Sequence, residues 1–215
     1  MKIGIIGAGK GGTGLGKHLS AKGHDIVVSF ARSDDKVQAA ADLIGGGARA
    51  GSPLEAANFG DVVIVATPWN VTLDVVRQIS AALDGKIVWD TTNPIKPDMS
   101  GLAVGTTTSA GEEIAKIVPG ARVVKAVAPF AEVLHSPSNR IDGRLPGVFV
   151  CGDDAAARKV VLSLVADIDA DGVDAGPLSL ARYTEPIGML LVQLAYVSGF
   201  GARIGSVLIQ DKGTH

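Results

Sequence analysis

Cysteine and aromatic residues are scarce in this chain of 215 residues. Its one cysteine, Cys151, excludes an intramolecular disulfide and a cysteine-rich metal site. Aromatic residues make up only 4%, too few for a base-stacking surface, and lysine and arginine are scattered along the chain. With a formal net charge of −2, these absences predict no nucleic-acid partner and no polybasic membrane patch.

A long uninterrupted apolar run is also missing. The most apolar segment, Ile187–Ile209, is broken by Gln193, Arg203 and several glycines and serines, whereas a membrane span needs about 20 cleaner residues. This segment therefore predicts one or two buried helices and no membrane contact. The sequence starts directly on a predicted strand, so we expect no signal peptide and a reducing cytoplasm, with Cys151 as a buried strand residue.

What the chain has in abundance is glycine, and its most informative cluster follows the first predicted strand. Ile3–Ile6 runs into the sequence Gly7-Ala8-Gly9-Lys10-Gly11-Gly12, and an amphipathic helix follows. In this G-x-G-x-x-G pattern, Gly7 allows a tight turn, Gly9 lets a pyrophosphate approach the backbone, and Gly12 lets the helix pack on the sheet. Free N–H groups at the start of the helix favour an anion. The pattern predicts a dinucleotide site.

Short β-branched runs alternate with helical patterns along most of the chain. The expected strands are Ile3–Ile6, Asp25–Phe30, Ala48–Ala50, Val62–Ala66, Lys86–Asp90, Arg122–Val127, Val148–Cys151 and Gly172–Ala175. The expected helices are Gly12–Lys22, Asp34–Ile44, Leu54–Asn58, Val71–Leu83, Ser109–Val118, one capped by Asp153 or Asp154, and a long helical region from Leu180. This alternation predicts an α/β fold: one Rossmann-like domain over residues 1–215, a doubly wound parallel sheet with C-terminal helices packed on it.

The end of the second predicted strand indicates which dinucleotide binds. An acidic residue there selects NAD, but this chain has Ser29 or Phe30 at that position. Arg32, Ser33 and Lys36 follow and offer donors to a 2′-phosphate. We therefore expect NADP.

Three loops follow the carboxyl ends of the fourth, fifth and sixth expected strands, where ligands bind in such sheets. They carry Thr67-Pro68-Trp69, Asn93-Pro94 and Pro129-Phe130. An indole, a carboxamide and a phenyl ring suit the lining of a flat nicotinamide and a flat partner. Turn formation alone also explains prolines at these positions.

A general acid or base near these loops is hard to find. His18 and His24 lie on the adenosine side and His215 is terminal, which leaves His135, with Lys125 and Glu132, as the candidate. His135 lies in a polar loop, so we assign no catalytic residue and no metal site. Hydride transfer between two bound redox cofactors requires no protein acid or base, since orientation and exclusion of water suffice.

Several stretches together resemble the NADPH-dependent F420 reductases (F420:NADP oxidoreductases), relatives of the reductase domain of the STEAP ferric reductases. The stretches are GIIGAGKGGTGLGKHLSAKGHDIVVSFAR, DVVIVATPWNV, IVWDTTNPI, VVKAVAPF, and the C-terminal CGDD followed by Asp174-Ala175-Gly176-Pro177-Leu178. The resemblance implies pyrophosphate contacts from Ala8 to Gly11, 2′-phosphate contacts from Arg32, Ser33 and Lys36, and nicotinamide contacts from Pro68, Trp69, Asn93 and Ala131. It further implies hydride transfer to F420 and a homodimer formed through C-terminal helices. We expect residues 178–215 to be a helical segment for dimerisation or for the second cofactor.

The small-molecule acceptor remains open at this level. A flavin, a quinone or a ferric chelate are alternatives to F420. Two other functions are an imine or keto-acid reductase of the pyrroline-5-carboxylate reductase type, which usually needs a longer helical C-terminal domain, and a non-catalytic NADP-binding redox sensor.

Overall fold

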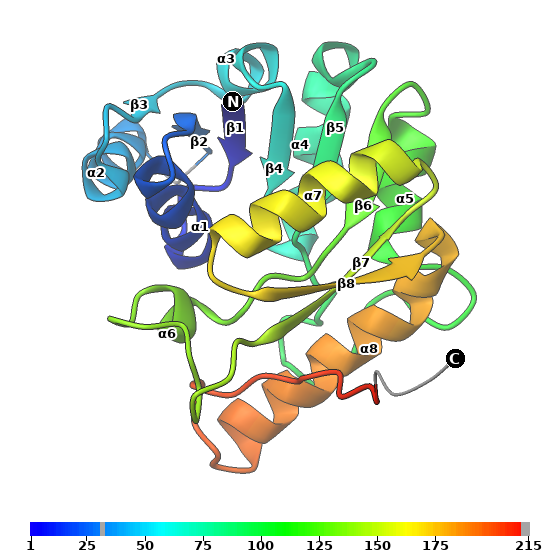
Figure 1. Ribbon diagram of the computed structural model, residues 1–215. Helices are drawn as coiled ribbons and strands as arrows, with labels where there is room; N and C mark the ends of the chain where they lie inside the picture. The colour runs from blue at the N-terminus through cyan, green and yellow to red at the C-terminus, as the bar shows by residue number, and fades with distance from the viewer. Residues whose placement is uncertain (31–32, 212–215) are drawn as a thin grey trace.

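One β-sheet organises the molecule (Figure 1). The computed structural model describes residues 1–30 and 33–211, and within them eight strands lie in the order β3-β2-β1-β4-β5-β6-β7-β8. Their bounds are β1 Lys2–Ile6, β2 Asp25–Ser29, β3 Arg49–Ala50, β4 Val62–Val65, β5 Ile87–Asp90, β6 Arg122–Lys125, β7 Gly147–Gly152 and β8 Asp171–Gly176. The order reverses direction between β1 and β4, as in a doubly wound Rossmann-like sheet.

Helices cover both faces of this sheet (Figure 1). They are α1 Lys10–Ala21, α2 Asp34–Ile44, α3 Pro53–Phe59, α4 Trp69–Ile79, α5 Ala110–Ile117, α6 Ala131–Leu134, α7 Ala155–Asp167 and α8 Ala181–Val192, with short turns η1 Ser80–Leu83, η2 Leu178–Leu180 and the π-helical η3 Gln193–Val197. Helices α1, α2 and α7 share one core with the sheet, and α3, α4 and α5 share the other. The expected α/β architecture is confirmed.

The strands form because their side chains are buried on both faces. Ile3 and Ile5 of β1 point into the core under α1, whereas Ile6 points into the core under α3 and α4. Strands covered on both sides therefore show continuous apolar runs without polar alternation. Gly4 is required here for packing, since a Cβ at this position would overlap the Ala56 carbonyl group of α3.

The expectation of an entirely parallel sheet is wrong at one edge. β7 is antiparallel to β6, with Lys125 opposite Cys151, and it is parallel to β8. The segment 126–146 between β6 and β7 contains only the four-residue helix α6. A parallel return requires a crossover of a dozen or more residues across the sheet, usually a long helix. This segment instead stays at the carboxyl ends of the strands, so β7 starts there and runs back.

The expected buried helices over Ile187–Ile209 are only partly correct. α8 and η3 end at Val197, and residues 198–211 form an extended tail that runs beside α8 (Figure 1). Leu190, Phe200 and Ile209 are exposed rather than buried. Hydrophobicity predicted burial, but this surface has no covering element among the described residues.

Two local expectations about β7 and α7 are confirmed. Cys151 is fully buried, and burial raises the pKa of its thiol to about 11, so the thiol stays protonated at neutral pH. Asp154 caps α7, because its Oδ1 accepts a hydrogen bond from Ala157 N–H (2.7 Å).

A buried ionic cluster joins α8 to the ends of the central strands. Lys125 Nζ, at the end of β6, lies 2.6 Å from Asp90 Oδ2 of β5 and 3.0 Å from Glu185 Oε1 of α8. It also donates to the Thr92 carbonyl oxygen (2.7 Å). Glu185 in turn accepts from the backbone N–H of Ala110 (3.0 Å), at the start of α5. All three charged side chains are at most 1% exposed, and burial raises the pKa of Glu185 above 4.5 although Lys125 opposes this shift.

Removing the ammonium group should destabilise the protein strongly. The substitution Lys125→Met leaves two buried carboxylates without a counter-charge, which costs about 3–5 kcal/mol of unfolding free energy. Lys116→Met is the control, because Lys116 is 64% exposed and pairs with Glu113 on the surface of α5. Urea unfolding measures both, and equal stability of the two variants would contradict the role of the cluster.

Candidate functional site

The glycine loop between β1 and α1 has the geometry of a dinucleotide-binding turn. Gly7 has a φ of +134°, a conformation that side chains disfavour. A Cβ at Gly12 would overlap the Gly7 carbonyl oxygen. The first bond within α1 runs from Thr13 N–H to Gly9 O (2.9 Å). The N–H groups of residues 10–12 therefore have no acceptor within the helix and are available to an anion.

Two other glycines of this loop have no internal reason to be glycine. A Cβ at Gly9 or Gly11 would meet no atom within 4 Å. Gly9 has φ −81° and ψ −179°, a conformation that any residue adopts. The free space lies where a pyrophosphate would approach the backbone, so the loop fits a dinucleotide.

A hollow beside the loop brings together residues from three helices. Ala8, Gly9, Lys10 and Lys36 line it, together with Thr13, Ala39, Ala40, Leu43, Ala131, Glu132 and His135. The two lysines give this hollow cationic groups for phosphates. Lys36 lies in the first turn of α2, and Ser33 is the residue immediately before this helix.

The predicted 2′-phosphate residues differ in how the structure places them. Ser33 is exposed, and its hydroxyl makes no capping bond to α2. Ser29 is fully buried, and its hydroxyl donates to Ile5 O (3.1 Å), so this side chain lies away from a ligand. Arg32 lies outside the described residues.

A cleft of about 320 Å³ lies at the carboxyl ends of the strands. Gly11, Leu15 and the ends of β4 and β5 form one end of it, and β7 forms the other. α8 and the tail form a wall. The lining residues are Gly11, Leu15, Ala66, Thr67, Thr91, Thr92, Asn93, Ile95, Val127, Ala128, Pro129, Phe130, Ala131, Pro146, Gly147, Phe149, Thr184, Ile187, Gly188, Leu191, Val192, Ile204, Gly205 and Ser206.

Asn93 is a polar side chain in this cleft with a buried oxygen that has no partner. The hydroxyls of Thr67 and Thr91 are already bonded within the protein, to Thr72 Oγ1 (2.9 Å) and Val65 O (2.9 Å). Asn93 Oδ1 is buried and has no hydrogen-bond partner. Because a buried carbonyl normally has a donor, a ligand N–H fits here. Gly188 of α8 makes room, since a Cβ there would lie 2.6 Å from Asn93 Nδ2.

The predicted nicotinamide-side residues are only partly brought together. Asn93 and Ala131 line the cleft, and Ala131 also lines the hollow beside the glycine loop. Pro68 is exposed, Trp69 is half-buried at the start of α4, and Pro94 is buried. None of these three is among the residues that line the cleft.

No ionisable side chain is found among the described residues that line the cleft. His135 lies beside the glycine loop instead, with Nε2 2.8 Å from Lys10 O. Lys125 is committed to the buried cluster, and Glu132 lies near the Tyr196 hydroxyl (3.4 Å). Within the described parts of the chain, no group of three His, Cys, Asp or Glu side chains is arranged for a metal ion.

Sequence reasoning did not anticipate two parts of the site. The first is the part of the cleft wall that the tail forms with residues 204–206, because residues 178–215 were expected to be helical and an extended tail has no periodic pattern. The second is the buried cluster. Lys125 in the apolar run Val123–Val127 and Glu185 in a largely apolar helix were its signal, since charges in such patterns are usually paired.

Comparison with known proteins gives a consistent family. The family described as "NADP oxidoreductase coenzyme F420-dependent" matches residues 2–94. The F420-dependent NADP reductase of Methanocaldococcus jannaschii is 31% identical over 97% of this chain and 100% of its own length. The rat metalloreductase STEAP3 is 26% identical over 89% of this chain and 37% of its own length. A crystal structure of an F420-dependent NADP-reductase candidate from Arthrobacter sp. FB24 shares the fold, with a TM-score of 0.86, 24% identity and coverage of 98% of this chain and 100% of that one.

The two kinds of glycine in the loop should respond differently to alanine. Gly9→Ala adds a methyl group only to free space, so we expect unchanged unfolding and a weakening of NADPH binding by about tenfold or more. Gly12→Ala forces an overlap with the Gly7 carbonyl and should cost about 1–3 kcal/mol of stability. Thermal unfolding and calorimetric NADPH titration distinguish the two effects. If the Gly9 variant bound NADPH as tightly as the wild type, the assignment of this loop to the NADP site would be wrong.

Proposed function

The chain belongs to the F420-dependent NADP reductase family, and from this premise we propose that it transfers hydride between NADP(H) and coenzyme F420 in the cleft at the strand ends. It is an NADP-linked oxidoreductase with NADP and F420 as its cofactors. When bound, these two cofactors supply the hydride donor and the hydride acceptor. The residues of the chain bind and orient them.

The glycine loop and the start of α2 are proposed to hold NADP. Backbone N–H groups from Gly9 to Gly12 face the pyrophosphate, and Lys10 and Lys36 line the adjacent hollow. Ser33, with its free hydroxyl, and Arg32, outside the described residues, are proposed to contact the 2′-phosphate. Ser29 is buried, and its hydroxyl donates to Ile5 O of β1, so we propose no side-chain contact from Ser29 to the ligand.

The nicotinamide end is proposed to reach the cleft past Ala131, which borders both hollows. Asn93 offers its unpaired Oδ1 to a ligand N–H, while Thr67 lines the wall. Pro68, Trp69 and Pro94 flank this position at the adjacent strand ends and remain proposed contacts. α8 and residues 204–206 of the tail are proposed to form the opposite wall, which faces the second cofactor.

The observation that carries this function is the absence of an ionisable side chain from the described cleft lining. Reduction of a carbonyl or an imine generally requires a proton donor near the reacting atom. Direct hydride transfer between two ring systems requires contact, orientation and exclusion of water, which an apolar cleft provides. The alternatives, an imine or keto-acid reductase and a non-catalytic redox sensor, are not favoured. A flavin-like acceptor is the remaining variation on the same chemistry.

We also propose that the protein works as a cytoplasmic homodimer. No described helix is long and apolar enough to cross a membrane. Tyr183, Leu190 and Val197 recur every seven residues on α8 and η3, and they are 67%, 58% and 65% exposed. A stripe of this kind is typical of a surface that a partner covers, and a second copy of α8 is a suitable partner.

Mixing the protein with NADPH and F420 without oxygen tests the activity. We expect NADPH and oxidised F420 to be consumed in equal molar amounts, as measured by their absorbances, with NADPH strongly preferred over NADH. Lys36→Ala should lower that preference by about tenfold, since it removes a cation that lines the hollow beside the glycine loop. Lys22→Ala, at the residue that follows α1 and pairs with Asp169, should leave the preference unchanged. Tight NADPH binding without oxidation by F420, FMN or a ferric chelate would instead favour the redox sensor.

Sedimentation velocity at micromolar concentration tests the dimer. Leu190→Asp places a charge within the exposed stripe and should shift the wild-type dimer toward monomer. Leu54→Asp is the matched control, because Leu54 is similarly exposed (52%) but lies on α3. A wild-type protein that sediments as a monomer would contradict the proposal.

A further inference from the structure

Two segments, the turn before β7 and the C-terminal tail, form the rim of the cleft at its β7 end. Gly147 N–H, at the start of β7, donates to Ser206 O of the tail (2.6 Å). A Cβ at Gly205 would lie 3.1 Å from the Cβ of Pro146, so tail and turn are tightly packed. Upstream of these contacts, the turn carries Arg140 and Arg144, and the tail carries Arg203. Arg144 lines a separate groove beside β8, whereas Arg140 and Arg203 contact each other.

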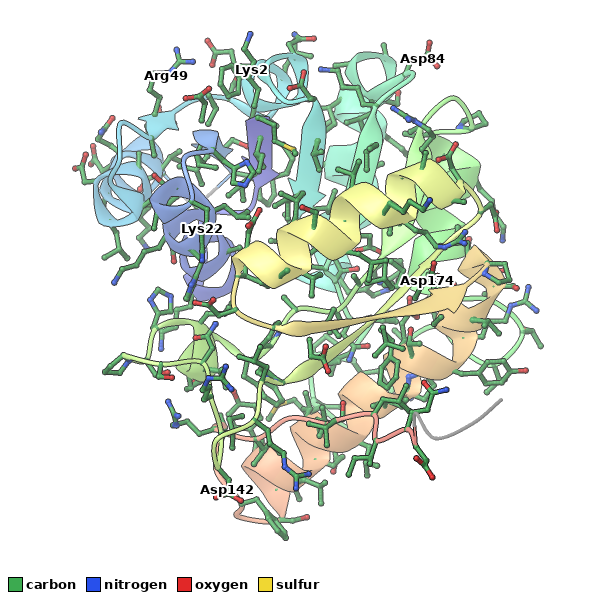
Figure 2. All side chains as sticks on the ribbon, viewed as in Figure 1. Lys2, Lys22, Arg49, Asp84, Asp142 and Asp174 are labelled. Carbon is green, nitrogen blue, oxygen red and sulfur yellow. The ribbon has the colours of Figure 1, made fainter. Side chains whose placement is uncertain are left out.

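Backbone carbonyls hold these two arginines next to each other. Arg203 Nη2 donates to Arg140 O (3.1 Å), and Arg140 Nη1 donates to Gly143 O (2.9 Å). Both residues are exposed, and among the described residues no carboxylate forms an ion pair with either guanidinium. Asp142 lies on the same turn, at the edge of the molecule in Figure 2, and it forms no ion pair with another described residue.

The size of the cleft decides which part of the coenzyme it holds. Its volume of about 320 Å³ is at the lower end for small-molecule sites, which suits a flat ring system. F420 also carries a phosphodiester and glutamate carboxylates, and an apolar lining cannot solvate these anions. The glycine loop and the proposed NADP site lie at one end of the cleft, so the anionic chain has the β7 end as its way out.

We propose that Arg140 and Arg203 bind the anionic tail of F420 where it leaves the cleft. A guanidinium binds phosphate or carboxylate oxygens through paired N–H donors, and these two keep donors free beyond their bonds to the backbone. Their anchored positions reduce the entropy lost on binding. The inference rests on the proposed function, because it assumes that F420 is the second cofactor.

Equilibrium binding without NADPH tests this assignment, with the fluorescence of the deazaflavin as the readout. The two ligands are F420 and 8-hydroxy-5-deazariboflavin, which has the same ring system but neither the phosphodiester nor the glutamates. For the double variant R140A/R203A we expect Kd to rise about tenfold or more for F420 and to stay within about twofold for the tail-less compound. R144A is the matched control, because Arg144 lies on the same turn but lines the groove beside β8.

Salt titration of the unmodified protein gives a second test that needs no variant. Screening should weaken F420 binding and leave binding of the tail-less compound nearly constant. The tail assignment would be overturned if the substitutions changed Kd equally for both ligands, or left Kd for F420 unchanged. In that case hydride transfer from NADPH to either ligand would still support the proposed function. Failure to bind or reduce either ligand would instead overturn the proposed function itself.

Discussion

The buried contact between Lys125, Asp90 and Glu185 is the constraint on which the site depends. It joins the ends of β5 and β6 to α8, the helix that walls the cleft. Charges in such a dry position are stable only while all partners are present. The same ammonium group binds the Thr92 carbonyl, and Thr92 and Asn93 line the cleft. Cleft shape is therefore coupled to an interaction that does not touch a ligand.

The site has two halves with different physical characters. The glycine loop is polar through its backbone, with free N–H groups and space beside Gly9 and Gly11. The cleft is mostly apolar and has no ionisable side chain among its described lining residues. An anionic dinucleotide suits the first half and flat redox rings suit the second. Ala131, on the boundary, borders both.

Most of the fold could be predicted from the sequence, because continuous apolar runs and glycine punctuation identify buried strands directly. The direction of β7 could not be predicted, because an apolar run reads the same for a parallel and an antiparallel strand. The path of residues 126–146 determines this direction. The glycine loop followed from local spacing, as did the strand-end position of Asn93. Long-range packing determines three features that local spacing does not encode: the burial of Ser29, the position of Trp69 outside the cleft lining, and the contribution of the tail.

The two sides of the cleft come from N-terminal and C-terminal parts of the chain, so they are synthesised at different times on the ribosome. The glycine loop, β1, β4 and β5 emerge early, and domains generally begin to fold from the N-terminus. Until α8 emerges, Lys125 has Asp90 but lacks Glu185, and the strand ends lack the wall formed by Gly188 and Ile204. The half that binds the dinucleotide can thus form on a nascent chain before the half for the second cofactor exists, so partial chains would hold NADP without a place to pass its hydride.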